Sequence, residues 1–230
     1  MIINSYFVRA RLFPTLLTAL PILGLVNYLF LHQFYYDLKN IFDVLPILSN
    51  LGLSTAVIFL SVQVNRLSSK ELFQKYFFKE ELEMPTTNHL LWHDNFFDNS
   101  TKESIRSKIL SKFSIALLSN EEEQKNEKLA RKRIVTAVSQ IRILLKNNEL
   151  LLQHNIEYGF FRNLLGGCTV AVLISLILIV LGSTYNIRGI FISGIAFFII
   201  YSIPILISKY LVNKFGTYYS KILYEQFLGA

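Results

Sequence analysis

The chain alternates between long apolar runs and polar segments. Four runs are long enough to cross a bilayer, because about 20 residues of helix span its hydrocarbon core. They extend from Leu12 to Leu31, from about Val44 to Val64, from Leu164 to Gly182 and from about Ile190 to Val212. The interior of each run lacks aspartate, glutamate, lysine and arginine. The pattern predicts an all-α membrane protein with four transmembrane helices.

The polar interval between the second and third runs has helical spacing. Apolar residues recur near every third or fourth position over 66–83, so the second span is expected to continue as a helix until Pro85 stops it. We therefore divide the chain into a first transmembrane hairpin at 1–64, a cytoplasmic helical module at 65–163 and a second transmembrane hairpin with a short tail at 164–230.

Two further helices are expected inside the module. One begins at Ser100 or Thr101 and continues to about Leu118. The other continues to about Asn147, and Asn120 followed by Glu123 resembles its N-terminal capping box. Its predicted buried face is formed by Ile134, Val138, Ile141 and Leu145.

The distribution of charge predicts the orientation, because cytoplasmic loops collect lysine and arginine. The N-terminus carries Arg9 and Arg11, the middle segment has 16 basic and 13 acidic residues, and the last loop has only Arg188. The first connection holds Asp37, Lys39 and Asp43, and the tail holds Lys209, Lys214, Lys221 and Glu225. We expect a multi-pass protein of the bacterial inner (plasma) membrane with both termini and the 65–163 segment in the cytoplasm.

Composition narrows the function classes. The chain is 52% hydrophobic and only 17% charged, which is unusual for a soluble protein. Its net charge of +7 comes from basic residues that are mixed with acidic ones, so a nucleic-acid partner is not expected. The single cysteine, Cys168, excludes a disulfide framework within the chain and a zinc site built on several cysteines. It falls in an apolar run and is expected to be a small buried side chain.

The segment from Met84 to Asp94 gathers the most unusual polar residues. Its candidate ligand or sensing residues are Thr86, Thr87, His89, His93 and Asp94. If the chain is helical from Asn88 onward, the two histidines lie at i and i+4 on one face, a spacing that suits a shared metal. No third ligand is evident by spacing, so neither a metal site nor a cofactor is expected. The alternative is that a threonine caps a helix and the histidines are interfacial or solvated.

A second polar segment enters the third run. Its candidate residues are Tyr158, Arg162 and Asn163. A tyrosine and an arginine suit the headgroup level of a membrane, so an anchor is one interpretation. The other interpretation is that Arg162 and Asn163 reach back to the region of Thr87 and Asp94 and complete one polar site.

These two segments resemble an uncharacterised bacterial four-span membrane protein family. Its members carry a P-T-T-x-x-L-R-H-x-D segment, and an E-N-x-x-Y-G-F-R-R-N segment before a transmembrane helix. The matching residues are Pro85, Thr86, Thr87, Leu90 and Asp94 in the first, and Asn155, Tyr158, Gly159, Phe160, Arg162 and Asn163 in the second. Leu91, Trp92, His154 and Phe161 depart from the pattern. The resemblance implies a membrane protein and no particular reaction.

Three functions fit these observations. The first is a membrane effector, by analogy with small anti-phage defence proteins: the cytoplasmic module senses a soluble protein or a small-molecule signal, and the spans, as a homo-oligomer, perturb the lipid bilayer. The second is an enzyme acting on a lipid headgroup or nucleotide, with His93 and Asp94 as acid–base pair and Arg162 as anion clamp. The third is a membrane scaffold that docks a soluble partner through Arg131-Lys132-Arg133. We favour the first, and the sequence leaves open whether the protein is an enzyme.

Overall fold

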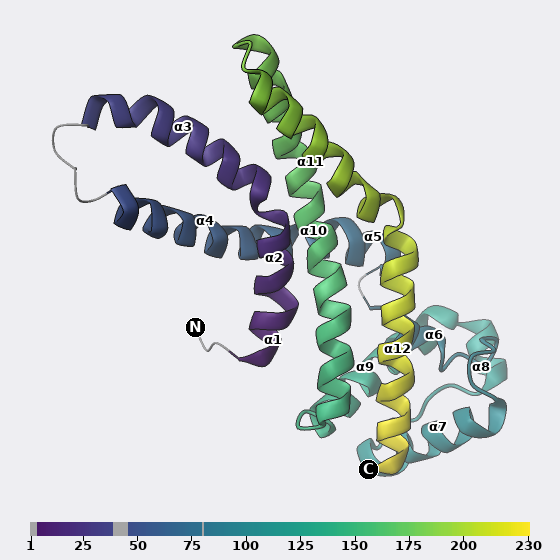
Figure 1. The fold of residues 1–230 in the computed structure, drawn as a ribbon. Helices are drawn as coiled ribbons and strands as arrows, with labels where there is room; N and C mark the ends of the chain where they lie inside the picture. Colours follow the sequence, from purple (N-terminus) through teal and green to yellow (C-terminus); the bar gives the residue numbers. More distant parts are fainter. Residues whose placement is uncertain (1–3, 39–45, 80) are drawn as a thin grey trace. The chain divides into compact units, whose positions relative to one another are not determined.

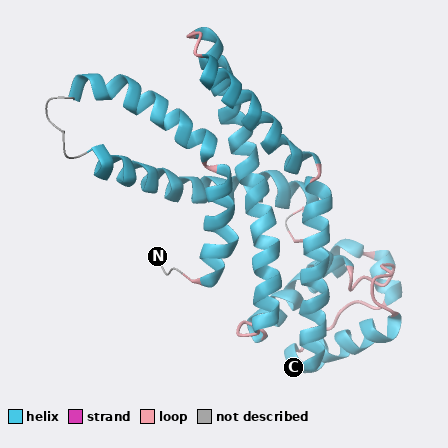
Figure 2. Ribbon diagram, viewed as in Figure 1, coloured by secondary structure: helices cyan, strands magenta, loops and turns pink. Residues whose placement is uncertain are grey.

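The protein is described by a computed structural model that covers residues 4–38, 46–79 and 81–230. Within these ranges every regular element is a helix and no strand occurs (Figure 2), which confirms the predicted all-helical fold. The chain forms two compact units. Unit 1 comprises Met1–Phe73 and Phe160–Ser208, and unit 2 comprises Gln74–Gly159 and Lys209–Ala230.

Unit 1 contains the apolar helices (Figure 1). In chain order they are α1 (Ser5–Phe7), the π-helical η1 (Val8–Leu12), α2 (Phe13–Thr18), α3 (Leu20–Leu38), α4 (Pro46–Ser68), most of η2 (Ser69–Gln74), the greater part of α10 (Glu149–Thr184) and α11 (Arg188–Leu206). Two of these, α10 and α11, are long and apolar enough to cross a membrane. A third crossing is added if the bent pair Ser5–Thr18 and Leu20–Leu29 counts as one span.

The first predicted span is not one straight helix. It breaks at Ala19, and its two halves differ in direction by 53°. Pro21 has no N–H, so it cannot donate to the carbonyl of Leu17 four residues before it. The hydroxyl of Tyr201 on α11 donates to that carbonyl at 2.7 Å instead. A side chain from another helix therefore satisfies the carbonyl that the proline leaves free.

The other predicted spans correspond to α4, α10 and α11. The predicted second span begins at Val44, which lies outside the described residues, as do Lys39 and Asp43 of the first connection. The third lies within α10, which begins fifteen residues before Leu164. The fourth ends at Leu206 rather than at Val212, because the helix breaks at Ile207 and α12 begins. Cys168 is 1% exposed, as expected.

Unit 2 is a helical module with its own core. Its helices are α5 (Lys75–Phe78), α6 (Pro85–Asn88), α7 (Asn99–Phe113), α8 (Asn120–Lys125), α9 (Glu127–Leu144), the start of α10, and α12 (Ser208–Gly229) apart from its first residue. The centre of the core is formed by Leu90, Leu91, Ile105, Ile109, Ile134, Val138, Ile141, Leu223, Tyr224 and Phe227. All four residues of the predicted α9 face are buried, which confirms that face. The C-terminal tail, predicted only as a short extension, is a helix of 22 residues that contributes to this core.

Several predicted helix boundaries in the module are wrong. The helix that follows α4 and η2 ends at Phe78, where Lys79 adopts a left-handed backbone conformation with φ of 40°. Pro85 therefore does not stop that helix. It occupies the first turn of α6, where a backbone N–H would have no partner within the helix, so that its absence costs nothing. Helix α7 begins at Asn99, before the predicted Ser100 or Thr101, because Asp98 is its cap, with the carboxylate accepting from the N–H of Thr101 at 2.7 Å. It ends at Phe113 rather than at about Leu118, because Ser114 adopts a left-handed backbone conformation with φ of 56°.

The capping box lies one residue before its predicted position. The Ser119 hydroxyl accepts from the N–H of Glu122 at 3.3 Å, and the Glu122 carboxylate accepts from the N–H of Ser119 at 2.9 Å. The predicted single helix is divided at Asn126, whose side chain caps α9 by accepting from the N–H of Leu129 at 3.1 Å. This shift leaves Glu123 available for the interior of the module.

Candidate functional site

The segment from Met84 to Asp94 lies in unit 2 and is helical only over α6. Because α6 ends at Asn88, the helix that would have placed His89 and His93 on one face does not form. His89 Nδ1 lies 2.9 Å from the hydroxyl of Ser220 on α12, whereas His93 Nδ1 lies 3.8 Å from the carboxylate of Glu123. Within the described residues no three histidine, cysteine, aspartate or glutamate side chains are grouped to hold a metal ion.

The two threonines of the segment are buried and hold the backbone in place. The hydroxyl of Thr87 donates to the carbonyl of Glu81 at 2.7 Å, which closes the turn before α6. The carbonyl of Thr86 accepts from the hydroxyl of Tyr224, a fully buried residue of α12. Burial raises the pKa of Tyr224, so this hydroxyl keeps its proton for the bond. Neither threonine side chain caps the helix, because Met84 occupies the capping position.

His89 is a buried, neutral imidazole. Its side chain stacks on Phe96 with ring centres 3.9 Å apart, and only 7% of the residue is exposed. Burial lowers the pKa of His89 to about 4; Asp94 raises it by less, and Lys102 lowers it further. At neutral pH the ring is therefore uncharged and packs between Phe96 and α12.

Two cations and one carboxylate lie beneath the segment, and we call them the buried ionic centre: Lys102, Arg106 and Glu123. Each is at most 9% exposed. Arg106 Nη2 lies 3.3 Å from the Glu123 carboxylate, and the guanidinium also donates to the carbonyls of Leu90 at 2.5 Å and Leu118 at 2.6 Å. Burial lowers the pKa of Arg106, but the neighbouring Glu123 opposes that shift. The pair meets the requirement that buried charges be paired and hydrogen-bonded.

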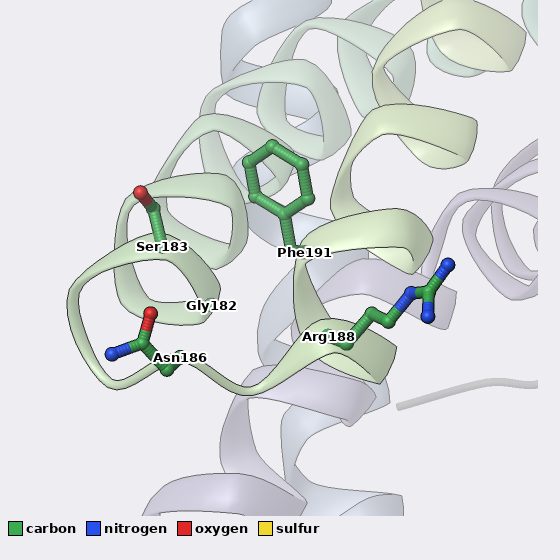
Figure 3. A pocket seen from close by; sticks show the side chains of 5 residues that line it. All are labelled: Gly182, Ser183, Asn186, Arg188 and Phe191. Atoms are coloured by element: carbon green, nitrogen blue, oxygen red, sulfur yellow. The ribbon is translucent and has the colours of Figure 1, made fainter.

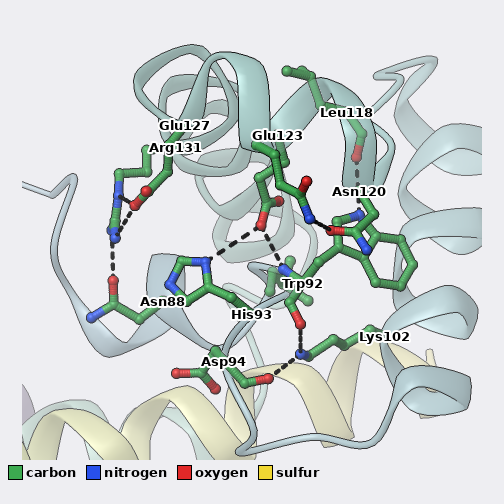
Figure 4. A network of polar contacts seen from close by, with 12 residues as sticks. Asn88, Trp92, His93, Asp94, Lys102, Leu118, Asn120, Glu123, Glu127 and Arg131 are labelled. Atoms are coloured by element: carbon green, nitrogen blue, oxygen red, sulfur yellow. Dashed lines mark hydrogen bonds and ion pairs between the residues drawn. The ribbon is translucent and has the colours of Figure 1, made fainter.

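Lys102 completes the centre by binding backbone rather than a carboxylate. Its ammonium donates to the carbonyl of Trp92 at 3.2 Å and to the carbonyl of Asp94 (Figure 4). The Glu123 carboxylate accepts from the N–H of Trp92 at 2.7 Å. Lys102 and Glu123 therefore bind the backbone carbonyls and a backbone N–H of the same short segment. The buried ionic centre therefore fixes the path of the chain from Leu90 to Asp94.

The arrangement does not favour an acid–base pair at His93 and Asp94. The Asp94 carboxylate accepts from the N–H of Phe96 at 2.9 Å, whereas the ring of His93 is directed toward Glu123 (Figure 4). Although His93 and Asp94 are adjacent in sequence, their side chains contact different partners. The contacts around the segment are those of a structural centre.

The second predicted segment is divided between the two units. Tyr158 belongs to unit 2, is 5% exposed and stacks on Tyr219 with ring centres 6.5 Å apart. Arg162 and Asn163 belong to unit 1. The eight predicted residues are therefore not one cluster within a single unit.

Asn163 joins a group of side chains that we call the polar cluster: Thr15, Thr18, Asn65, Ser69 and Asn163. All are at most 5% exposed. The Asn163 amide accepts from the hydroxyl of Ser69 at 3.1 Å and donates to the carbonyl of Ala10 at 2.7 Å. The residue four positions after Ala10 is Pro14, which has no N–H to offer that carbonyl. Asn163 therefore satisfies the carbonyl that Pro14 leaves free, as Tyr201 satisfies the carbonyl that Pro21 leaves free.

Close helix contact accompanies the polar cluster. Asn65 donates to the hydroxyls of Thr15 at 3.2 Å and Thr18 at 3.3 Å, which ties α4 to α2. A Cβ atom at Gly166 of α10 would lie 2.2 Å from the carbonyl oxygen of Asn65, and one at Gly167 would lie 2.3 Å from the Thr18 hydroxyl. Glycine at these two positions lets α10 approach the backbone at Asn65 and the side chain of Thr18 this closely.

Sequence reasoning missed the buried ionic centre, although a signal for it was present. Lys102 and Arg106 each stand three residues before an isoleucine of the buried α7 face, Ile105 and Ile109, so their side chains leave the helix on the same face. Charged residues within an apolar stripe indicate buried ions with partners elsewhere.

Two of the three residues in Arg131-Lys132-Arg133 have internal partners. Arg131 donates to the carbonyl of Leu82 at 2.8 Å and to the Asn88 side chain at 2.6 Å, and it pairs with Glu127 at 2.7 Å. Arg133 donates to the carbonyl of Ala116 at 2.9 Å. These bonds do not favour the docking role that the triplet suggested.

A cavity of about 220 Å³ lies at the turn between α10 and α11 (Figure 3). Its lining residues are Gly182, Ser183, Asn186, Arg188 and Phe191. Asn186 has a φ of 53°, a left-handed conformation that asparagine tolerates. The side chains of Asn186 and Arg188 point in different directions, so the polar groups do not converge on one ligand.

In comparisons with known proteins, no family model, no curated protein and no solved structure matches the chain.

Proposed function

We propose that the chain is a four-span protein of the bacterial inner membrane with both termini and the 65–163 segment in the cytoplasm. The polar cluster supports this topology. It links Thr15 near the start of the first run, Asn65 at the end of the second and Asn163 just before the third. In an up-and-down arrangement of spans, these three ends lie on the same side. That side is the one which the basic residues assign to the cytoplasm.

The composition of unit 2 also supports the topology. It combines Gln74–Gly159 with Lys209–Ala230, two segments far apart in sequence. Charge assigns both to the cytoplasm, and a compact unit needs both on the same side of a membrane.

We propose further that the protein is a membrane effector, in which unit 2 receives a signal and the spans perturb the bilayer. The observation that carries this proposal is the bent first span. Its two prolines leave carbonyls that Asn163 and Tyr201 satisfy from two other helices. Breaking these bonds would free the broken span to change its bend, and discrete rearrangements of this kind underlie many switches.

The signal has a direct covalent route to the spans. The chain passes between the units at Phe73–Gln74, Gly159–Phe160 and Ser208–Lys209, and these three points lie inside η2, α10 and α12. A soluble protein or small molecule bound by unit 2 would act through these helices. A bilayer-perturbing opening would need several copies of the spans, so a homo-oligomer belongs to the proposal.

The resemblance of the Pro85–Asp94 and Asn155–Asn163 segments to the bacterial four-span family supports the same placement. Membership in that family remains part of the proposal. The role in anti-phage defence rests on analogy of size and layout with other small defence proteins.

Membrane potential in a bacterial host tests the effector function. The full chain is induced, and a voltage-sensitive dye is read before and after infection with a panel of phages. We expect depolarisation and growth arrest on strong induction or on infection. Normal polarisation and growth under both conditions would contradict the proposal.

Matched glycine variants make the test specific. Gly166→Ala places a methyl group against the Asn65 backbone, whereas Gly189→Ala meets nothing within 4 Å. Depolarisation should be lost with Gly166→Ala and retained with Gly189→Ala at equal amounts in the membrane.

A further inference from the structure

The exposed face of α12 carries a stripe of tyrosines and lysines, which we call the Tyr–Lys stripe: Tyr210, Lys214 and Tyr218. These residues are four apart and so lie on one side of the helix. Tyr210 is 61% exposed and Tyr218 is 44% exposed. The opposite side of α12 is buried in the core of unit 2 through Leu223, Tyr224 and Phe227. The stripe is therefore not used for packing the module.

The stripe begins close to the end of an apolar helix. Tyr210 follows Leu206, the last residue of α11, by four residues. Even a fully extended chain of four residues reaches only about 14 Å. Each headgroup layer of a bilayer is roughly 5–8 Å thick. If α11 spans the membrane, Tyr210 must lie in or beside the headgroup layer.

The charge along the sequence around the stripe is entirely positive. The sequence has no aspartate or glutamate between Glu157 and Glu225. Glu225 lies 3.7 Å from Lys221, one turn beyond the stripe. Lys209 and Lys214, which precede Lys221, are both exposed. This end of α12 therefore presents cations that have no carboxylate near them in sequence.

The stripe is also organised to hold an anion. Lys214 Nζ donates to the Tyr210 hydroxyl at 3.2 Å and lies 5.4 Å from the centre of its ring. Because the phenol oxygen accepts this bond, its own proton remains free to be donated. The bond to Tyr210 raises the pKa of Lys214, which keeps the ammonium charged. A phosphate diester offers acceptor oxygens to both groups.

We propose that Tyr210, Lys214 and Tyr218, together with Lys209, bind the headgroup of an anionic phospholipid at the end of α11. This inference rests on the proposed function only in that α11 must span the membrane. Anionic lipids attract juxtamembrane lysines, and tyrosine rings are enriched at the same depth. The stripe combines both preferences.

Native mass spectrometry of the purified full chain in detergent tests the inference. Phosphatidylglycerol, which is anionic, is titrated against phosphatidylcholine, which is zwitterionic, and bound lipids are counted. We expect tighter binding of phosphatidylglycerol. Lys214→Gln should lower its affinity about five-fold, as follows from about 1 kcal/mol per lysine near an anionic surface. Tyr210→Phe, which keeps the ring and loses the hydroxyl, should also lower it.

Lys221→Gln is the matched control, because Lys221 lies on the same helix and pairs with Glu225. Its affinity for phosphatidylglycerol should stay within two-fold of the unmodified chain. Equal binding of the two lipids, or an equal loss with Lys221→Gln, would overturn the inference. Equally strong binding of free glycerol phosphate would place the ligand in solution and would also overturn it.

This readout is separate from depolarisation. A chain that binds phosphatidylglycerol through the stripe but leaves the membrane polarised would contradict the effector function alone. Loss of lipid preference in a chain that still depolarises cells would contradict the stripe alone.

Discussion

The guanidinium carbon of Arg106 lies 4.3 Å from the centre of the Trp92 ring, and Trp92 is the only tryptophan of the chain. The indole N–H donates to the carbonyl of Leu118 at 3.2 Å, the same carbonyl that Arg106 binds. Trp92 therefore sits on the buried ionic centre of unit 2. Its fluorescence should report the unfolding of that unit without any added label.

Removing the carboxylate of the buried ionic centre should destabilise unit 2. Glu123→Gln keeps the shape and an acceptor for the N–H of Trp92, but it leaves the charge of Arg106 buried without its counter-ion. Such losses cost about 3–5 kcal/mol of unfolding free energy. A denaturant titration of the full chain in detergent, followed by Trp92 emission, measures the change. Glu121→Gln, an exposed neighbour, should shift the free energy by less than about 0.5 kcal/mol. Similar unfolding midpoints for the two variants would contradict a structural role for the ion pair.

His89 should make unit 2 less stable in mild acid. Its pKa is about 4 in the folded protein against an ordinary value of 6.5, so between these pH values the unfolded chain binds the extra proton. The contribution of His89 to the free energy of unfolding is therefore fully present above pH 6.5 and is lost as the pH decreases toward 4. From pH 7 to pH 5 the loss from this group is about 2 kcal/mol.

The same Trp92 titration, repeated at pH 7 and pH 5, measures this effect. His89→Gln should reduce the difference between the two pH values, whatever its own effect on stability. His93→Gln, at a histidine whose side chain is 62% exposed, is the comparison variant. An unchanged pH dependence in His89→Gln would show that another group is responsible.

The predictability of this fold differs between the apolar runs and the polar module. The apolar runs that became α10 and α11 were found from sequence because a span must satisfy its backbone internally and present apolar side chains over a fixed length. The break at Ala19 was not predicted, although Pro14 and Pro21 lie in this run, because the bend depends on which neighbouring side chains satisfy the carbonyls that the prolines leave free.

In the module, the helical faces were predictable and the helix starts were not. Ser119 and Asn120 are both good capping residues with a glutamate three positions later, so the local sequence fits either register. The choice is made by Glu123, which binds Arg106 from a different helix. The contacts of the candidate residues were not predictable for the same reason: the chemistry of Thr86, His89 and Asp94 was visible in the sequence, but their partners on α7 and α12 are far away along the chain.

The contact between Tyr201 and the carbonyl of Leu17 should matter only because of Pro21. Tyr201→Phe removes the donor and leaves a carbonyl without its partner, which costs about 1 kcal/mol in measured membrane helices. Pro21→Ala restores an N–H that can donate to Leu17 within the helix. The cost of Tyr201→Phe should therefore shrink in the Pro21→Ala background.

Cys168 provides the probe for this double-mutant cycle. It is the only cysteine, is buried in unit 1 and packs with Tyr201. The rate at which a thiol-reactive dye labels it under mild denaturation reports the opening of unit 1. Equal effects of Tyr201→Phe in both backgrounds would show that the Tyr201 hydroxyl does not compensate for the N–H that Pro21 lacks, and would contradict the prediction.

Gly166 should tolerate no side chain, because α10 meets the α4 backbone there. A methyl group would lie 2.2 Å from the carbonyl oxygen of Asn65 and 2.8 Å from the nitrogen of Ser69, and backbone atoms cannot rotate away as a flexible side chain could. Gly166→Ala must push the two helices apart, which would also stretch the bond between Ser69 and Asn163. Overpacking of this kind costs about 1–3 kcal/mol.

We expect faster labelling of Cys168 in Gly166→Ala and unchanged labelling in Gly189→Ala, which meets nothing within 4 Å. Trp92 emission should stay the same in both variants, because the strain arises within unit 1. Unchanged labelling of Cys168 in Gly166→Ala would mean that α10 and α4 are not in contact at this point.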